Sequence, residues 1–398
     1  MSARVPLIAC VAVLAFFAGI TAVPLAYALA YALILVLVVA YIWSRSVARR
    51  IRVNRESPRG QYMIGEPFEE TFTAHNTSGL RLPYCEVLDK AEIAGYAPGR
   101  AFSLPAGGSV TWRARGVFTR RGRHRFGPLI ARLGDPFGLF PRRVMVGAEA
   151  DVIVYPAIHP LDEATPLWAG SGVSDLRRGR PVDVAPDVSS IREYDPHDGL
   201  SRIHWPSTAR TGKLMSRLYD TRQSSDLLVL LDLQRGVHFG RGSESTLEYA
   251  VSLAASVCHA AIRRGQAVGL VSNDREVTAF GAGRGETQRL RILDYLALAD
   301  DDGGVPLAET IRKHGEGWRG RGGIVVITPN RDQSWVEALV DTVTRGQRHL
   351  CVFVEPTSFG ARGNALRIPA AWRLVLDWWI VRRGDVIAAA DRVRAVGS

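Results

Sequence analysis

Two long apolar stretches dominate the hydrophobic pattern at the start of the chain. Residues 5–23 and 25–43 contain no charged side chain, and each has close to the ~20 residues that an α-helix needs to cross a bilayer core. Pro24 separates them. The pattern predicts a hairpin of two transmembrane helices within residues 1–50. A cleaved signal peptide and a single long tilted span are the alternatives.

Arginines crowd the segment directly after the second apolar stretch. Cationic residues near span ends stay on the cytoplasmic side of a membrane. We therefore expect a multi-pass protein of the bacterial inner membrane, with the N-terminus and the C-terminal bulk in the cytoplasm. The same residues could contact anionic lipid head groups. The basic flank consists of Arg45, Arg49, Arg50, Arg52 and Arg55.

From residue 51 to 165 the period changes to short alternating segments broken by Gly and Pro. In Ser109–Arg115, for example, Val110, Trp112 and Ala114 share one face. Many short strands separated by turn signals predict a β-sandwich. The run Asp135–Phe140 is interpreted as a strand end followed by a tight turn whose two Phe side chains fill the core.

Residues 223–398 show the alternation of an α/β domain with a doubly wound parallel sheet. Leu227–Leu231 is a continuous apolar run, as expected of a buried parallel strand, and it ends at Asp232. Ser245–Arg264 places its apolar residues on one helical face. The glycine-rich segment 281–285 predicts a flexible turn. Further strands are expected at 267–271, 323–328 and 350–354, and further helices at 286–298, 306–314 and 334–345.

A densely charged segment, residues 166–222, links the two predicted domains. Arg pairs well with carboxylates, so an ion-pair latch at the domain junction is the leading interpretation. A general acid–base site within residues 192–213, using His204 among others, and a partner-binding surface are the alternatives. The residues singled out are Arg192, Glu193, Tyr194, Pro196, Asp198, Arg202, His204, Trp205 and Arg210.

These residues and their spacing resemble the signature of the family known as domain of unknown function 58. The hairpin of spans and the Asp135–Phe140 run match that family too, whereas His197 stands where the family usually has Gly. The resemblance implies a membrane-anchored protein with a C-terminal von Willebrand A-like domain. It also implies an association with MoxR-type AAA+ ATPases, and in some members with other von Willebrand A or transglutaminase-like proteins.

The von Willebrand A resemblance directs attention to the end of the first strand of the α/β domain. In metal-binding members this strand ends Asp-x-Ser-x-Ser, and a Thr and a second Asp complete an oxygen-lined site for a divalent cation. Here Asp232 is kept, but Gln234 and Gly236 replace the serines, Val305 replaces the Thr and Pro329 the later Asp. One carboxylate is too few for a small hard cation, so we expect a degenerate site without metal and no cofactor.

Composition adds little to this picture. The formal net charge is +11, but the arginines are scattered rather than clustered with aromatic residues, so we expect no nucleic-acid partner. The four cysteines are too far apart in the sequence to suggest a zinc or disulfide framework. The sequence favours a membrane-tethered cytoplasmic scaffold or adaptor without catalytic residues, working with a MoxR-type ATPase in complex assembly or maturation. An acid–base enzyme and a protein that binds membrane surfaces or nucleic acid are the alternatives.

Overall fold

The computed structural model divides the chain into two compact units, Met1–Tyr155 and Pro156–Ser398. We describe each unit by itself. The residues that the structure describes are 4–21, 23–56, 62–91, 93, 95–161, 188–194, 203–219, 226–318, 322–343, 349–363, 366–385 and 392–393.

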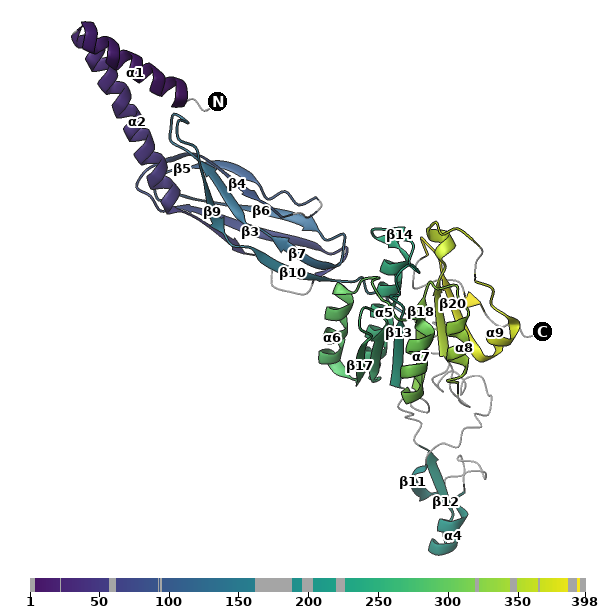
Figure 1. Cartoon of the computed structure of the whole chain (residues 1–398). Helices are drawn as coiled ribbons and strands as arrows, with labels where there is room; N and C mark the ends of the chain where they lie inside the picture. Colours follow the sequence, from purple (N-terminus) through teal and green to yellow (C-terminus); the bar gives the residue numbers. More distant parts are fainter. Residues whose placement is uncertain are drawn as a thin grey trace. The chain divides into compact units, whose positions relative to one another are not determined.

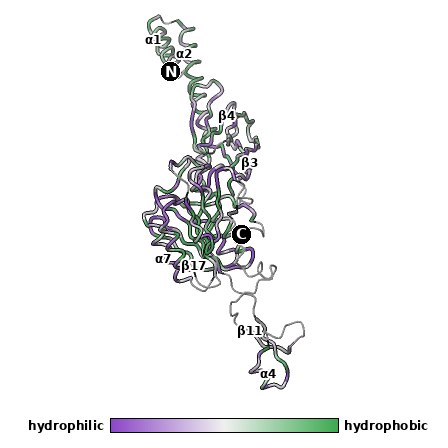
Figure 2. The backbone as a smooth tube through the Cα atoms, turned by 90° about the vertical axis from the view of Figure 1, so that its right-hand side faces the viewer, coloured by the Kyte–Doolittle hydropathy of each residue, from purple (hydrophilic) through white to green (hydrophobic). Residues whose placement is uncertain are grey.

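The first unit begins with two helices, α1 (Arg4–Thr21) and α2 (Pro24–Arg50), which lie side by side in Figure 1. Proline at the first turn of α2 costs no hydrogen bond, because the first N–H groups of a helix have no intrahelical partner. Figure 2 colours most of both helices as hydrophobic. Among the described residues, α2 alone is long and apolar enough to cross a membrane; the apolar part of α1, Ile8–Phe17, is shorter.

The last turns of α2 are built into the rest of the first unit. Val47 and Ala48 belong to its buried core, and Ser44 is fully buried. The Trp43 indole N–H donates to the carbonyl of Arg81 at 2.9 Å, and the Ser44 hydroxyl donates to the carbonyl of Phe140 at 2.6 Å. Strand β1 starts directly after the helix, so α2 enters the sheet region without an intervening linker.

Three sheets pack around this core, and we call them with the core the sandwich (Figure 1). Their orders are β1-β3-β6, β5-β4-β8-β9 and β2-β10-β7, and all pairings are antiparallel except that of β2 with β10. The strands are β1 (Ile51–Glu56), β2 (Tyr62–Met63), β3 (Pro67–Asn76), β4 (Leu82–Asp89), β5 (Arg100–Leu104), β6 (Ser109–Val117), β7 (Gly122–Phe126), β8 (Leu129–Leu133), β9 (Arg142–Gly147) and β10 (Ala150–Tyr155).

The alternation seen in the sequence matches the burial along these strands. In β6, Trp112 and Ala114 are buried while their neighbours are exposed. The interpretation of Asp135–Phe140, however, was wrong in one respect. Phe137 is 61% exposed, and Leu139 is the buried apolar side chain of that turn. Asp135 accepts three backbone N–H bonds within the turn, so its carboxylate fixes the loop and leaves Phe137 outside the core.

The second unit is built on a seven-stranded sheet of order β17-β16-β13-β18-β19-β20-β21. The five central strands are parallel, and the edge strands β17 and β21 run antiparallel to their neighbours. Their bounds are β13 (Asp226–Leu231), β16 (Val268–Ser272), β17 (Thr278–Gly283), β18 (Gly322–Thr328), β19 (His349–Val354), β20 (Leu376–Val381) and β21 (Arg392–Val393). Counted from β13 in chain order, the first six strands stand 3-2-1-4-5-6, as in doubly wound folds.

Helices cover both faces of this sheet (Figure 1). Leu228 and Leu230 share a core cluster with residues of α7 and α8, while α5 packs on β13 from the other side, next to α6. The elements are α5 (Thr246–Arg263), α6 (Gly285–Leu298), α7 (Leu307–Gly315), α8 (Ser334–Val340), α9 (Ala370–Val375), the 3-10 turns η4 (Glu316–Trp318) and η5 (Pro356–Phe359), and the short pair β14 (Gly240–Arg241) and β15 (Glu244–Ser245).

The elements expected from the sequence are present here with two differences. Residues 281–283, expected in a flexible turn, end strand β17, whose pairing with β16 is set by the sheet and not by local propensity. Helix α8 ends at Val340, five residues before the expected end at 345. Ser245 caps α5 as expected, since its hydroxyl accepts the backbone N–H of Glu248 at 3.3 Å.

The charged segment forms a small element of its own in the part that the structure describes. Strands β11 (Val188–Glu193) and β12 (Met215–Tyr219) pair in antiparallel fashion, and helix α4 (Trp205–Thr211) precedes β12. We call residues 188–194 and 203–219 the signature hairpin.

Candidate functional site

The candidate site is the carboxyl edge of the parallel sheet in the second unit. In doubly wound sheets, ligands bind outside the carboxyl ends of the strands at the point where the strand order reverses. Here that point lies between β13 and β18. Asp232 follows the last residue of β13, and Thr328 is the last residue of β18. The structure brings these two residues and the loop of Val305 together.

Asp232 is completely buried, and hydrogen-bond donors surround its carboxylate. One oxygen, Oδ2, accepts the Thr328 hydroxyl at 2.6 Å. The other, Oδ1, accepts the Asn273 side-chain amide at 2.9 Å and the backbone N–H of Gln234 at 3.1 Å. A buried charge is tolerated only when such donors compensate its lost hydration. Asp232 therefore acts here as a hydrogen-bond acceptor that joins the ends of β13 and β18.

Asn273, which follows β16, ties three segments together. Its side-chain N–H groups donate to Asp232 and to the carbonyl of Val305 at 2.9 Å, and its Oδ1 accepts the N–H of Leu233 at 2.6 Å. Gly303 packs directly against this residue: a Cβ atom there would lie 1.8 Å from the Asn273 carbonyl oxygen. The loop before α7 is thus held at the sheet edge by contacts that a larger side chain at 303 would prevent.

A second polar cluster lies at the end of β16 and was not foreseen from the sequence. The Tyr295 hydroxyl donates to Asp274 at 2.6 Å and also contacts the Ser272 hydroxyl, and Asp274 accepts the Thr278 hydroxyl. Burial, with the Asp274 hydrogen bond adding to it, raises the pKa of Tyr295 well above its ordinary value of 10.0. A tyrosine that keeps its proton is a donor and not a nucleophile, so this cluster is suited to positioning.

No metal-binding group is found among the residues that the structure describes, in the sense of three or more His, Cys, Asp and Glu side chains close together. The neighbours of Asp232 are hydrogen-bond donors and not metal ligands. The amide of Asn273 and the backbone N–H of Gln234 both direct hydrogens at its carboxylate. His238 contacts the backbone carbonyl of Asp232 at 2.9 Å and the Thr246 hydroxyl at 3.1 Å, so both ring nitrogens are engaged. The expectation of a degenerate, metal-free site remains a prediction.

The signature hairpin gives His204 a structural role. His204 caps α4, because its Nδ1 accepts the backbone N–H of Ser207 at 3.3 Å. The same nitrogen lies 2.8 Å from the Ser207 hydroxyl. Its backbone N–H donates to Met215, and Tyr194 donates to Leu214 in the same way. One ring nitrogen of His204 is thus engaged in capping α4, and the acid–base site within residues 192–213 stays a prediction.

The rest of the predicted cluster is only partly visible. Trp205 is 64% exposed and Arg210 is exposed. Pro196, Asp198 and Arg202, with His197, lie outside the described residues, as do the side chains of Arg192 and Glu193. The ion-pair latch therefore stays a prediction.

The signature hairpin and most of the α/β sheet also match a known protein family. A family model described as "Protein of unknown function DUF58" matches residues 190–355. Residues 190–355 belong to the DUF58 family. The "Uncharacterized protein YeaD" of Bacillus subtilis (strain 168) is 27% identical over 197 residues, covering 48% of this chain and 46% of that protein. The chain thus spans about half the length of this relative in the alignment.

Two solved structures are similar over about a quarter of the chain. The CARDB domain of the PF1109 protein from Pyrococcus furiosus is 16% identical, with a TM-score of 0.21, over 26% of this chain and 86% of that one. A FixG-related protein from Vibrio parahaemolyticus is 11% identical, with a TM-score of 0.20, over 26% and 96%. Such low TM-scores support no inference about function.

The DUF58 segment runs from the signature hairpin to β19 and contains the whole of the sheet edge described above. Asp232, Asn273, Val305 and Thr328 all lie inside it. The sandwich and the apolar helices lie outside it.

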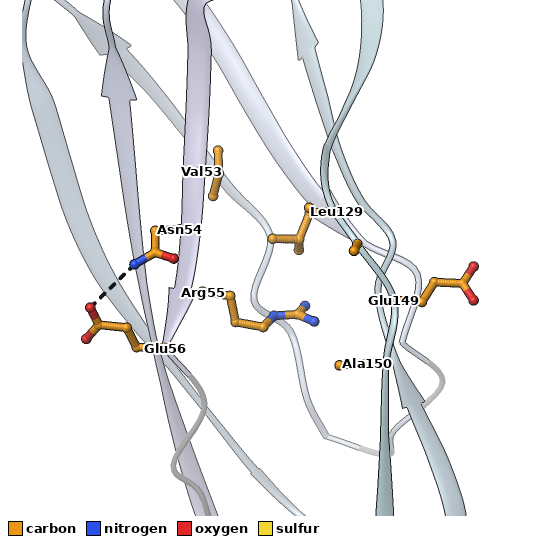
Figure 3. Close-up of a pocket in the computed structure, with 9 residues that line it drawn as sticks. Val53, Asn54, Arg55, Glu56, Leu129, Glu149 and Ala150 are labelled. Atoms are coloured by element: carbon orange, nitrogen blue, oxygen red, sulfur yellow. Dashed lines mark hydrogen bonds between the residues drawn. The ribbon is translucent and has the colours of Figure 1, made fainter.

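The basic flank was predicted as one surface, and the structure corrects this for one member. Arg55 points into the sandwich, where its side chain is 10% exposed (Figure 3). It forms an ion pair with Asp89, and its guanidinium lies 5.3 Å and 5.5 Å from the ring centres of Phe72 and Phe126. The reason is the two-residue period of β1, which turns Ile51, Val53 and Arg55 inward. Arg45, Arg49, Arg50 and Arg52 are exposed.

The Arg55 cluster borders a cavity of about 910 Å³ between β1 and the β9–β10 turn (Figure 3). Glu70, 3.8 Å from Arg55 Nε, accepts the hydroxyl of Tyr96. Asp89 also accepts the N–H groups of Ala91 at 2.9 Å and Gly127 at 2.8 Å. Two carboxylates thus lie beside one guanidinium, and the bonds of Asp89 hold the ends of β4 and β7 in the core.

Proposed function

We propose that this protein is a scaffold or adaptor tethered to the bacterial inner membrane by the α1–α2 hairpin, with both units in the cytoplasm. The observation that carries the proposal is α2. Its apolar stretch is long enough to cross a bilayer, and large apolar side chains along it, among them Leu25, Leu29 and Leu35, are exposed in the first unit. Lipid is the solvent that suits such a surface.

The orientation rests on the charges that follow the apolar stretch. Four exposed arginines stand within residues 45–52, at the end of α2 and the start of β1. Cationic residues at this position keep a span end on the cytoplasmic side. Because the two helices form a hairpin, the N-terminus lies on the same side.

The second unit is proposed to be a von Willebrand A-like domain that binds a protein partner at its carboxyl edge without a metal ion. Two observations support this. The strand order 3-2-1-4-5-6 with an antiparallel third strand is compatible with that fold. The loops at this edge are joined by hydrogen bonds around Asp232, which would preorganise them for a partner.

The proposed partner is a MoxR-type AAA+ ATPase, with other von Willebrand A or transglutaminase-like proteins as further candidates. Support comes from the DUF58 signature alone. The exposed Trp205 of the signature hairpin is a suitable contact residue, because aromatic side chains dominate the energetics of protein interfaces.

Two experiments test the proposal. A reporter that is active only in the cytoplasm, fused after Ser398, should be active in cells, and activity of a periplasm-specific reporter at the same position would contradict the orientation. Full-length protein in detergent should retain a MoxR-type ATPase from the same cell and change its ATP turnover. If Trp205→Ala retains the ATPase as well as the wild type does, Trp205 of the signature hairpin is not a contact residue. If the wild type does not retain the ATPase, the proposed partnership is wrong.

A further inference from the structure

One end of the sandwich lies against the last turns of α2. Three loops meet there, residues 77–81, 105–108 and 134–141. Asn76 joins the first two through bonds from its side chain to the carbonyls of Leu80 and Pro105, both at 2.9 Å. Trp43 and Ser44 of α2 bond to Arg81 and Phe140, which places the first and third loops against the helix.

The position of the third loop along α2 fixes its depth relative to a membrane. The apolar stretch of α2 runs from Pro24 to Trp43, and at 1.5 Å rise per residue it spans about 30 Å, the thickness of a bilayer core. The ring of Phe140 packs edge-on against Tyr41 with centres 5.6 Å apart. Tyr41 lies in the last turn of that stretch, so loop 134–141 reaches the level at which hydrocarbon gives way to head groups.

The side chains at this level suit a head-group environment. Phe137 is 61% exposed at the tip of the loop, next to Pro136. The guanidinium of Arg142 lies 5.3 Å from the ring centre of Tyr41 and donates to Ser44 at 3.2 Å. Aromatic residues beside arginines are typical of membrane interfaces.

Acidic side chains are kept away from this end. Asp135 is the one acid in the three loops, and it is 4% exposed, with its oxygens occupied by the N–H groups of Phe137, Leu139 and Phe140. The opposite end of the sandwich carries exposed acids, among them Glu66 and Glu149. Anionic head groups would repel the opposite, acidic end of the sandwich and would not repel the α2 end.

We propose that the α2 end of the sandwich rests in the head-group layer of the bilayer, with Phe137 inserted at the boundary of the acyl chains. This inference rests on the membrane tethering proposed above. The occupant of the exposed surface around Phe137 is the lipid of the same membrane that α2 crosses, because the loop is joined to the last turn of the span by the contacts of Tyr41 and Ser44. The sandwich is then held at a fixed depth instead of hanging from a linker.

The test uses full-length protein in liposomes, with an environment-sensitive fluorophore on single introduced cysteines. Cys10 is exposed and is replaced by Ala, whereas Cys85, Cys258 and Cys351 are buried and remain. Burial raises the pKa of Cys85 and of Cys258 to about 12, so these thiols stay protonated and unreactive. The three label positions are Phe137→Cys, Ile34→Cys within α2 as the positive control, and Val117→Cys, an exposed apolar position at the opposite end of the sandwich, as the negative control.

Lipids with a quencher on the acyl chain, placed high on the chain for label 137 and near the bilayer centre for label 34, should quench these two labels several-fold more than the label at 117. Label 137 should also show blue-shifted emission compared with label 117. Quenching at 34 without quenching at 137 would overturn the inference and leave the tethering intact. Absence of quenching at 34 would overturn the tethering itself, and equal quenching at 117 and 137 would show that the sandwich has no defined orientation on lipid.

Discussion

Replacing Asn273 by alanine removes one side chain that holds three segments of the α/β unit at once. The variant leaves the N–H of Leu233 without its 2.6 Å acceptor and takes one of three donors from the Asp232 carboxylate. Both residues are completely buried, so water cannot replace the lost partner without opening the sheet edge. The carbonyl of Val305 also loses its side-chain donor, which releases the loop before α7.

The size of the effect follows from these groups. A buried N–H left unpaired costs about 1–3 kcal/mol, and a hydrogen bond to a charged group contributes about 1.5–3 kcal/mol. We expect the free energy of unfolding of this unit to fall by roughly 3–5 kcal/mol, a large part of a typical domain's stability of about 5–15 kcal/mol. For a domain of this size the melting temperature falls by about 2–4 °C per kcal/mol, so the expected shift is on the order of 10 °C.

Thermal melting of the full-length protein in detergent measures the shift, and amide hydrogen exchange of the peptides that contain β13 and β16 locates it. Thr287→Ala on the exposed side of α6 is the matched control, with an expected change within about 0.5 kcal/mol. A melting temperature within about 2 °C of the wild type, with unchanged exchange at Leu233, would refute the claim that Asn273 holds the sheet edge together.

Three further predictions follow from single features. His204→Ala removes the cap of α4 and should destabilise the signature hairpin by about 1 kcal/mol, with His204→Asn restoring it; loss of an enzymatic activity without any change in hydrogen exchange would favour the acid–base alternative instead. Titration of the full-length protein with Mg²⁺ and Mn²⁺ should release no binding heat, and a site in the micromolar range that Asp232→Asn abolishes would contradict the predicted loss of the metal site. Burial lowers the pKa of His159, His259 and His314 below 6.5, so near that pH the unfolded chain binds more protons than the folded one. The free energy of unfolding should therefore fall as the pH drops through 6.5, and His259→Gln should reduce its slope against pH.

Long periodic segments were predictable from the sequence because their burial follows from local pattern. Leu227–Leu231 and the helix capped by Ser245 appear almost at the expected residues. The edge strand β17 was not predictable, because it contains three glycines or alanines near its end and its strand conformation comes from pairing with β16. Propensity was overridden there by the neighbouring strand.

The polar contacts of the candidate site were beyond the sequence for a different reason. Asp232 could be found because it ends an apolar strand, but its partners Asn273 and Thr328 stand 41 and 96 positions away. Arg55 shows that one available signal was not used. Its alternation with Ile51 and Val53 in β1 placed it on the inward face, whereas its membership in a run of arginines suggested the membrane flank.

The continuity of α2 with the sandwich also determines which part of the helix can be removed from the first unit. Val47 and Ala48 fill the core, and Trp43 and Ser44 bond to two of its loops, so the last two turns of the helix belong to the fold of the first unit as much as to the span. Burying a valine contributes about 1.5–3 kcal/mol, which a chain cut after the end of α2 at Arg50 would lose. The lipid-facing and core-facing residues are therefore joined by one rigid helix. In the proposed tethering, a movement of α2 is transmitted directly to β1, which begins at the next residue.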